Sequence, residues 1–207
     1  TKQKTIYQFL KKVQYLYIIL SSKMKTDLST YNNDWYCPGS AKKRIVWYVM
    51  NELLVRNPLN PSSGLKIAIL RLFGAKIGNH VMIKPKVNIK YPWKLRIGDH
   101  CWIGEGVWID NLDEVVIEAH VCISQGAFLI CGNHNYKTSS FDLMIAPITL
   151  KQGAWVGAKS VVGPGVTFES HAVLSLGSVA SASLDAYGIY RGNPAQKIKE
   201  RVILKSE

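Results

Sequence analysis

Aliphatic side chains recur with a period of six residues along the middle of the chain. Two residues before each of them stands another small or aliphatic side chain. A hexad of this kind is the sequence signature of a parallel β-helix, in which one inward side chain per short strand fills the core. The recurring residues, in steps of 6, 6, 8, 6, 6, 8, 6 and 6, are Ile77, Ile83, Ile89, Ile97, Ile103, Ile109, Ile117, Ile123 and Leu129.

The eight-residue steps define the length of one coil, because 97−77 and 117−97 are both 20. Ile77, Ile97 and Ile117 should therefore stack at the spacing of neighbouring strands, about 4.8 Å. Helices of this hexapeptide type wind left-handed, against the usual right-handed preference of crossovers; the handedness is a property of the known fold and not of the period. We expect an all-β fold: a left-handed parallel β-helix over residues 74–184, with an N-terminal helical segment and a short C-terminal helix.

The hexad pattern is interrupted between Leu129 and Leu150 and returns shifted by three residues, because 150−129 is 21. Residues 130–147 should form a loop that leaves the rigid scaffold, and such loops often carry catalytic groups. His134 lies in this loop, and a histidine titrates in the range that suits a general base near neutral pH. A solvated loop histidine without a catalytic role is the alternative.

Helical spacing of apolar residues appears at the N-terminal side of the repeat, over residues 1–73, which we expect to form an extension and a cap. Ser40 should cap one helix, and Gly74 should end another that begins near Gly64. At the other end, residues 185–207 should form a turn at Gly192-Asn193-Pro194 followed by a helix. The stripe expected to pack from the helix after Ser40 consists of Ile45, Val46, Val49, Met50, Leu53 and Leu54.

The composition is that of one soluble domain with an appendage, with 207 residues of which 47% are hydrophobic. A net charge of +12 favours anionic partners. No helix-turn-helix, RNA-binding or zinc motif accompanies the charge, so we expect no nucleic acid partner. The four cysteines show no metal-binding spacing and indicate reduced thiols in a cytoplasmic protein.

Residues 2–25 combine apolar side chains at helical spacing with six lysines. The charge-free run is too short to span a bilayer, and no small-residue cleavage site follows it. One interpretation is a helix on an anionic membrane surface, which would bring the protein to the inner membrane. The other is a helix packed on the domain or on a neighbouring subunit.

Histidines recur at the coil period of 20 residues, at His80, His100 and His120. A column of histidines raises the alternative of a zinc enzyme like the gamma-class carbonic anhydrases. That class uses two ligands in an HxxxxH pair, and the chain contains no such pair. We therefore interpret the three histidines as solvent-facing corner residues and expect no metal. A non-enzymatic β-helix binding module is a further alternative.

Several motifs, in order over residues 31–202, resemble those of hexapeptide-repeat O-acetyltransferases that use acetyl-CoA. They are IKYPW, IGEGVWIDNL, VCISQGA, GNHNY, GAWVGA and GNPA, which begin at Ile89, Ile103, Val121, Gly132, Gly153 and Gly192. The resemblance is closest to the colanic acid biosynthesis branch. It implies an acyltransferase that moves an acetyl group from acetyl-CoA to a hydroxyl of a sugar or lipid-linked glycan in surface polysaccharide biosynthesis.

The resemblance also implies roles for individual residues. His134 would be the general base of a direct transfer, without an acyl-enzyme or a metal, in a homotrimer with each site between two subunits. Acceptor contacts are expected from Glu105, Asp110 and Asn111, which could equally be turn formers. Trp155, Ala158, Leu176 and Lys199 match positions that contact CoA or lie beside the catalytic histidine in the family. Cofactor contacts are also expected from Gly157, Ser160, Gly177 and Asn193, among which Gly157 and Ser160 are small residues that would let a ligand approach the backbone.

Two positions depart from the family pattern. Gln196 stands where relatives often have a basic residue, and Ser181-Ala182 replaces a common Thr-Lys pair. The phosphate groups of CoA would then be held less tightly, or would use other cations near the C-terminus: Arg191, Lys197 or Arg201.

Overall fold

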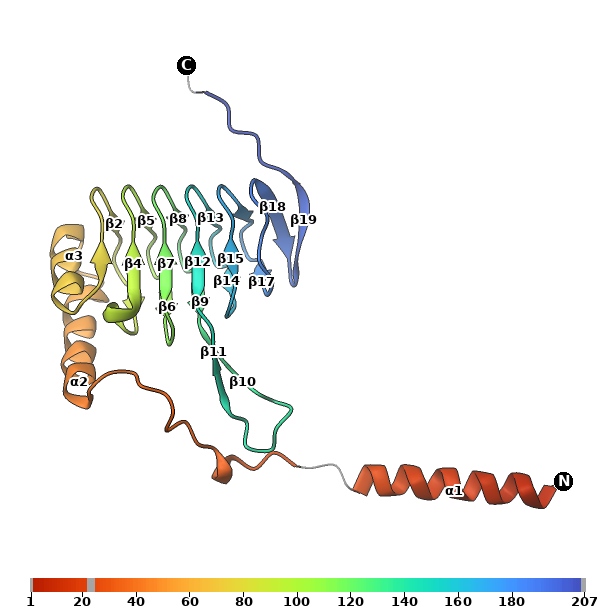
Figure 1. Cartoon of the computed structure of the whole chain (residues 1–207). Helices are drawn as coiled ribbons and strands as arrows, with labels where there is room; N and C mark the ends of the chain where they lie inside the picture. The colour runs from red at the N-terminus through yellow and green to blue at the C-terminus, as the bar shows by residue number, and fades with distance from the viewer. Residues whose placement is uncertain (1, 22–24, 206–207) are drawn as a thin grey trace. The chain divides into compact units, whose positions relative to one another are not determined.

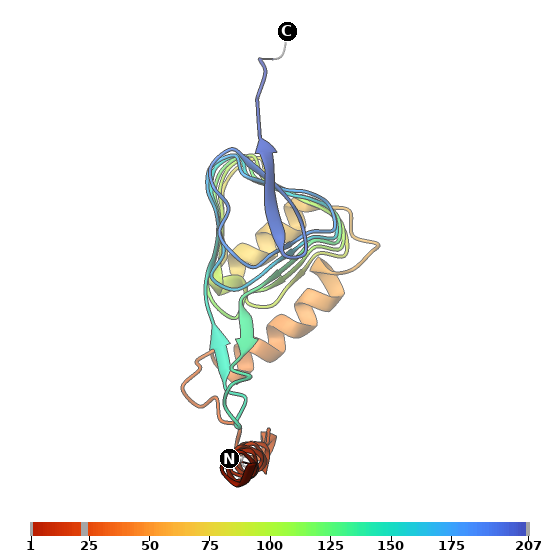
Figure 2. The same ribbon diagram turned by 90° about the vertical axis from the view of Figure 1, so that its right-hand side faces the viewer.

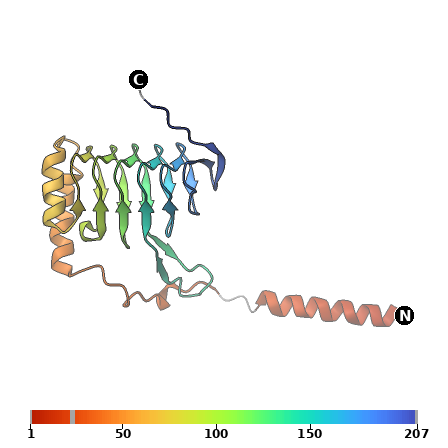
Figure 3. The same cartoon turned by 45° about the horizontal axis from the view of Figure 1, so that its top comes forward.

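A computed structural model describes residues 2–21 and 25–205 of the chain. The chain divides into two compact units, one comprising residues 1–34 and 134–143 and the other residues 35–133 and 144–207. The second unit contains the hexad repeat and forms a three-sided parallel β-helix (Figures 1 and 3). The view along its axis shows the coils superimposed as a triangle (Figure 2). The predicted left-handed β-helix is confirmed.

The three sides of the β-helix are separate sheets, which we name A, B and C and which are parallel except for the last strand of sheet B. Sheet A contains β1 (Lys76–Ile77), β4 (Leu95–Ile97), β7 (Val115–Ile117), β12 (Ile148–Leu150) and β15 (Thr167–Phe168). Sheet B contains β2 (Met82–Ile83), β5 (Trp102–Ile103), β8 (Cys122–Ile123), β13 (Trp155–Val156), β16 (Val173–Leu174), β18 (Gly188–Gly192) and β19 (Ala195–Glu200). Sheet C contains β3 (Asn88–Ile89), β6 (Trp108–Asp110), β9 (Phe128–Ile130), β14 (Val161–Val162) and β17 (Val179–Ala180).

The hexad isoleucines form vertical stacks inside the β-helix, as the coil period predicts. Ile77 pairs with Ile97, and Ile97 pairs with Ile117, in consecutive strands of sheet A. These side chains are buried and belong to one continuous core. Burial of stacked aliphatic side chains on three sides supplies the main stabilisation of the coils.

The interrupted segment leaves the β-helix as a hairpin and returns in register. Its strands are β10 (Gly132–His134) and β11 (Leu143–Ile145). Cys131 donates its N–H to the Asp110 carbonyl at 3.2 Å, and its own carbonyl accepts from the Ala146 N–H at 3.0 Å. Beyond the hairpin, Leu150 stacks directly on Ile117 in sheet A. The shift of three residues in the hexad is therefore the length of an insertion and not a defect of the coil.

Helices cover the N-terminal end of the β-helix (Figure 1). They are α2 (Ala41–Met50), which continues as a π-helical turn η2 (Asn51–Val55), and α3 (Ser63–Leu72). The predicted cap at Ser40 is present, because Ser40 Oγ accepts from the Lys43 N–H, and Ser62 caps α3 in the same way by accepting from the Leu65 N–H. A short η3 (Pro92–Lys94) follows β3. The helices thus cover the open strand edges of the first coil.

The buried face of α2 differs from the predicted stripe. Trp47, Asn51 and Val55 face the β-helix at helical spacing, and the Trp47 Nε1–H donates to the Ile89 carbonyl at 2.9 Å. This hydrogen bond and the bulk of the indole fix the rotation of the helix. Met50 and Leu54 are half-buried, as expected of the predicted stripe, but its other members are exposed: Ile45, Val46, Val49 and Leu53.

The predicted C-terminal helix is wrong, because residues 195–200 form β19 instead. β19 pairs antiparallel with β18, whose other edge pairs with β16. The last coil leaves a row of backbone hydrogen-bonding groups without a partner, and an antiparallel strand satisfies them. Gly192, at a φ of 105°, starts the turn that makes this return.

The first unit contains α1 (Lys2–Ser21), η1 (Leu28–Thr30) and the tip of the hairpin. The helix predicted for residues 2–25 is confirmed as far as Ser21, and residues 22–24 lie outside the described residues. Within this unit the Asp27 N–H donates to the Ser139 carbonyl at 2.8 Å. The described helices contain no segment whose length and hydropathy would let it cross a lipid bilayer.

Candidate functional site

His134 is the last residue of β10, at the point where the hairpin enters its tip. Its Nδ1 lies 2.9 Å from the Phe141 carbonyl oxygen. A carbonyl oxygen only accepts, so Nδ1 carries the hydrogen and Nε2 carries the lone pair of the neutral ring. The imidazole is thus held in the tautomer that a general base requires.

Aromatic rings surround the imidazole of His134. The Phe141 ring stacks on it with centroids 4.5 Å apart and planes 7° apart, and the Tyr31 ring lies at 5.9 Å. Phe141 has a φ of 54°, which turns its carbonyl back toward the histidine. Neither aromatic residue was singled out in the sequence, because their contacts depend on the conformation of the tip.

Most of the residues that match cofactor-binding positions meet on the second unit, at the corner between sheets B and C in the last coils. The Gly177 N–H donates to the Ala158 carbonyl at 2.8 Å. A Cβ on Gly157 would lie 2.5 Å from the Leu176 nitrogen, so only glycine allows this close approach of two coils. Leu176 is exposed beside them. The corner therefore presents backbone and small side chains that an extended ligand could lie along.

Trp155 stands on β13 next to this corner. Its ring is exposed on sheet B, and its Nε1–H donates to Ser124 Oγ at 2.9 Å. This hydrogen bond restrains the indole against the preceding coil. A fixed aromatic wall of this kind suits contact with an apolar segment of a ligand.

Ser160 lies inside the β-helix and not on the cofactor corner. Its side chain is fully buried, and its Oγ donates to the Ser175 carbonyl at 2.9 Å and accepts from the Ser178 N–H at 3.3 Å. The hydroxyl fastens two coils together. The side chain is therefore not available to a ligand, and only the backbone at Ser160 could take part in the predicted cofactor contact.

The basic residues of the C-terminal hairpin differ in how far they are already engaged. Lys199 is exposed on β19 opposite Ile189, and Asn193 is exposed in the turn. Lys197 forms ion pairs with Asp185 and Glu200 at 3.4 and 2.8 Å. The Arg201 guanidinium donates to the carbonyls of Gly153 and His171. Of these described cations, only Lys197 forms ion pairs, and Lys199 and Arg191 have neither an ion pair nor the carbonyl contacts of Arg201.

The three residues expected to contact the acceptor occupy different environments. Glu105 is exposed and pairs with Lys86 at 2.8 Å, which lowers the pKa of its carboxyl. Asp110 is 9% exposed and pairs with Lys90 at 2.8 Å.

Asn111 is fully buried. Its Oδ1 accepts a hydrogen bond from the Tyr91 N–H, and its Nδ2 donates one to the Tyr91 carbonyl. Its amide is committed to the scaffold, so the predicted contact of Asn111 with an acceptor does not agree with the structure.

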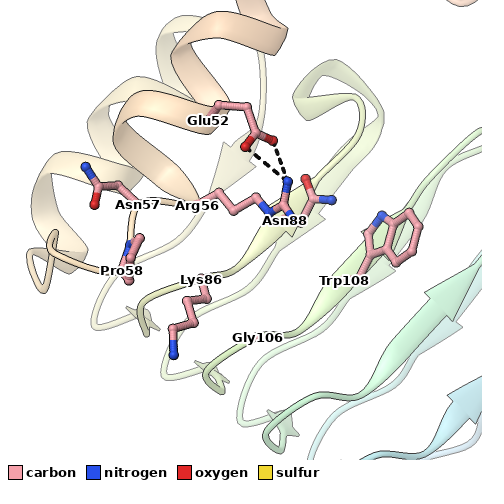
Figure 4. Close-up of a pocket in the computed structure, with 8 residues that line it drawn as sticks. All are labelled: Glu52, Arg56, Asn57, Pro58, Lys86, Asn88, Gly106 and Trp108. Atoms are coloured by element: carbon pink, nitrogen blue, oxygen red, sulfur yellow. Dashed lines mark hydrogen bonds and ion pairs between the residues drawn. The ribbon is translucent and has the colours of Figure 1, made fainter.

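A groove that the sequence did not indicate lies between the α2–η2 helix and sheet C (Figure 4). Its cavity measures about 710 Å³. Trp108, Asn88 and Arg56 line it. The one available signal was Asn51, a polar residue at helical spacing between Trp47 and Val55 on the buried face.

Within the described part of the chain, no group of three histidine, cysteine, aspartate or glutamate side chains is arranged to hold a metal ion. His80, His100 and His120 do form the predicted column, with ring centroids 4.8 and 5.1 Å apart. They stack face to face on exposed turns.

Sequence comparison relates the chain to acetyltransferases. WcaF of Escherichia coli strain K12, a protein assigned as a colanic acid biosynthesis acetyltransferase, is 38% identical over 164 residues, covering 79% of this chain and 90% of WcaF. The galactoside O-acetyltransferase of Escherichia coli strain K12 is 24% identical over 186 residues, covering 88% and 87% of the two chains. No family model matches the chain.

The fold is shared with solved acetyltransferases. A hexapeptide-repeat acetyltransferase from Vibrio cholerae, complexed with acetyl coenzyme A, superposes with a TM-score of 0.71 at 19% identity over 81% of this chain and 93% of that chain. A galactoside acetyltransferase in complex with coenzyme A gives 0.71 at 22% identity over 81% and 84%. With the hexad β-helix, the loop histidine and the identity to WcaF taken together, the chain belongs to the hexapeptide-repeat acetyltransferases and is an acyltransferase.

Proposed function

We propose that the protein transfers an acetyl group from acetyl-CoA to a hydroxyl of a sugar or lipid-linked glycan in surface polysaccharide biosynthesis, with His134 as general base. The observation that carries the proposal is the hydrogen bond from Nδ1–H to the Phe141 carbonyl, which fixes the tautomer with the basic lone pair on Nε2. The name of WcaF supports the polysaccharide context, and the bound coenzymes of the solved structures support the donor.

The reaction would be a direct transfer. His134 Nε2 takes the proton of the acceptor hydroxyl while the oxygen attacks the thioester carbonyl. The tetrahedral intermediate then expels the CoA thiolate, which receives the proton back from the imidazolium. Holding both reactants in one complex supplies much of the rate, and no acyl-enzyme is needed.

Acetyl-CoA would bind along the corner between sheets B and C in the last coils. Trp155 and Leu176 offer apolar contacts, and the backbone at Gly157, Ala158 and Gly177 can approach a pantetheine arm closely. Lys199, with Asn193 in the preceding turn, supplies a charge for the phosphate groups.

We also propose a homotrimer in the cytoplasm that contacts the inner membrane surface. The exposed apolar residues of α2 support an assembly, since such patches often mark protein interfaces. The four free cysteines support a reducing compartment. For α1, exposed apolar side chains together with lysines suit an anionic lipid surface.

Replacement of His134 tests the mechanism. We expect His134→Ala to lower the rate of acetyl transfer by about 10² to 10⁴, because a general base contributes that much. Acetyl-CoA affinity, measured by calorimetry, should stay within about twofold, since the residue acts on the hydroxyl. His80→Asn, a histidine on an exposed turn, is the matched control and should keep full activity.

Two results would contradict this mechanism. If His134→Ala transferred acetyl at the full wild-type rate, His134 would not be the general base. Radiolabel retained on the denatured protein after incubation with labelled acetyl-CoA alone would show an acyl-enzyme and refute direct transfer.

A further inference from the structure

The groove between the α2–η2 helix and sheet C has the size of a ligand site. Two adjoining cavities of about 700 and 710 Å³ share Glu52, Arg56, Asn88 and Trp108 as lining residues. Figure 4 shows Glu52 and Arg56 on the helix close to Asn88, with Trp108 standing apart on the neighbouring strand. Cavities of this volume hold ligands of a few hundred daltons.

A buried polar atom in the groove lacks a partner. Asn51 is 5% exposed, and its Nδ2 donates to Asn88 Oδ1 at 2.8 Å. Its Oδ1 has no hydrogen-bond partner among the described residues. Buried carbonyl oxygens are normally satisfied, so this atom calls for a donor from outside the chain. Asn51 begins the π-helical turn, a type of distortion that frequently occurs at functional sites.

Three of the four basic side chains that line the groove are held in ion pairs, and Arg44 is the fourth. Arg56 binds Glu52 at 2.8 Å, Lys86 binds Glu105 at 2.8 Å, and Lys90 binds Asp110 at 2.8 Å. A phosphate-rich ligand would require cations that are free to contact it. Paired charges present fixed donors and acceptors side by side, which suits a ligand bearing several neutral hydroxyl groups.

An aromatic platform forms one wall. The Trp108 ring is supported from behind by Phe128, with centroids 4.6 Å apart and planes 22° apart, and Trp108 remains 44% exposed. A supported indole presents a flat apolar face. The C–H face of a pyranose ring complements such a surface, while its hydroxyls reach the polar groups at the edge.

We propose that this groove binds a pyranose unit, with Trp108 under the ring face and with Asn51 Oδ1, Glu52 and Asp110 accepting from its hydroxyls. That the unit belongs to the acceptor glycan rests on the proposed transferase function. Binding of a pyranose in the groove does not depend on that function.

Saturation-transfer NMR of the whole protein with the methyl glycosides of glucose, galactose, mannose and fucose tests the proposal. We expect ring-proton signals from at least one glycoside in the wild type and their loss in Trp108→Ala. Trp108→Phe should keep them, because it retains a platform. Trp102→Ala is the matched control, since Trp102 holds the same hexad position on the neighbouring face of the same coil and is 59% exposed.

Asn51→Leu provides a second variant, which should also lose the signals. If Trp108→Ala does not fold, this variant tests whether the groove binds the glycoside. The proposal is overturned if no glycoside gives a signal, if the signal survives in both variants, or if uridine diphosphate alone gives a Trp108-dependent signal. The NMR experiment contains no acetyl-CoA, so it measures glycoside binding independently of acetyl transfer. If a glycoside binds but a separate assay with acetyl-CoA detects no acetyl transfer, only the transferase proposal is refuted. Acetyl transfer without glycoside binding would refute only the groove.

Discussion

The imidazole of His134 is oriented by the backbone of Phe141, seven residues further along the chain. The histidine itself could be singled out from the sequence, because it lies where a strict hexad is interrupted. Its partner could not, because Phe141 reaches the ring only through a tip conformation with positive φ. The sequence likewise could not show that the side chains of Ser160 and Asn111 are buried and form hydrogen bonds with the scaffold.

The cysteines allow a test at the scale of single residues. Burial raises the pKa of the Cys131 thiol to about 11, and burial also raises the pKa values of Cys101 and Cys122. Cys37 is exposed. In the native protein at pH 8 we therefore expect a thiol reagent such as dithionitrobenzoate to modify Cys37 rapidly, the half-buried Cys122 more slowly, and Cys101 and Cys131 only after unfolding, because these two buried thiols stay protonated.

The raised pKa also predicts how stability depends on pH. Above about pH 9 the unfolded chain loses the Cys131 proton while the folded chain keeps it, so the folded state binds more protons. The free energy of unfolding should then fall as the pH rises from about 9 to 11. Cys131→Ala should show a shallower fall in urea unfolding curves, and an equal slope would contradict the assignment.

At the scale of elements, the coils approach one another most closely at glycine corners. A Cβ on Gly98 would lie 2.6 Å from the Ala119 nitrogen and 2.8 Å from the Glu118 carbonyl carbon. Both contacts are with backbone, which cannot rotate away. We expect Gly98→Ala to destabilise the protein by roughly 1–3 kcal/mol in urea unfolding, because the coils must separate.

Gly64 in α3 provides the matched control for this substitution. A Cβ at Gly64 meets nothing within 4 Å, and the residue lies in a helix. Gly64→Ala should be neutral or stabilising by up to about 1 kcal/mol. Equal destabilisation by the two substitutions would show that coil contact is not the cause.

The C-terminal segment shows where element prediction failed. Residues 195–200 contain Ile198 between lysines and a glutamate, a composition compatible with a helix or a strand. The edge of β18 decides between them, because it offers backbone partners that a helix would leave unused. Arg201 then fastens the hairpin to the carbonyls of Gly153 and His171.

At the scale of the whole molecule, the net charge of +12 should act on the binding of the anionic donor. We expect the dissociation constant for CoA, measured by calorimetry, to rise several-fold between low and 0.5 M NaCl, since salt screens exposed charges. Lys199→Gln should weaken binding and flatten this salt dependence. Lys42→Gln, an exposed lysine on α2, should leave both unchanged, and an effect equal to that of Lys199→Gln would indicate a diffuse field.

The sequence by itself determined the β-helix, its coil length, the stacked isoleucines and the place of His134, because a strict hexad allows only one way to bury its apolar residues. Tertiary structure decided the rotation of α2, the C-terminal strand, the Phe141 contact and the groove around Asn51 and Trp108. Each of these depends on which surface lies opposite a residue. Local periodicity carries no information about that surface, so the interrupted hexad could identify the histidine but not the residues that hold it.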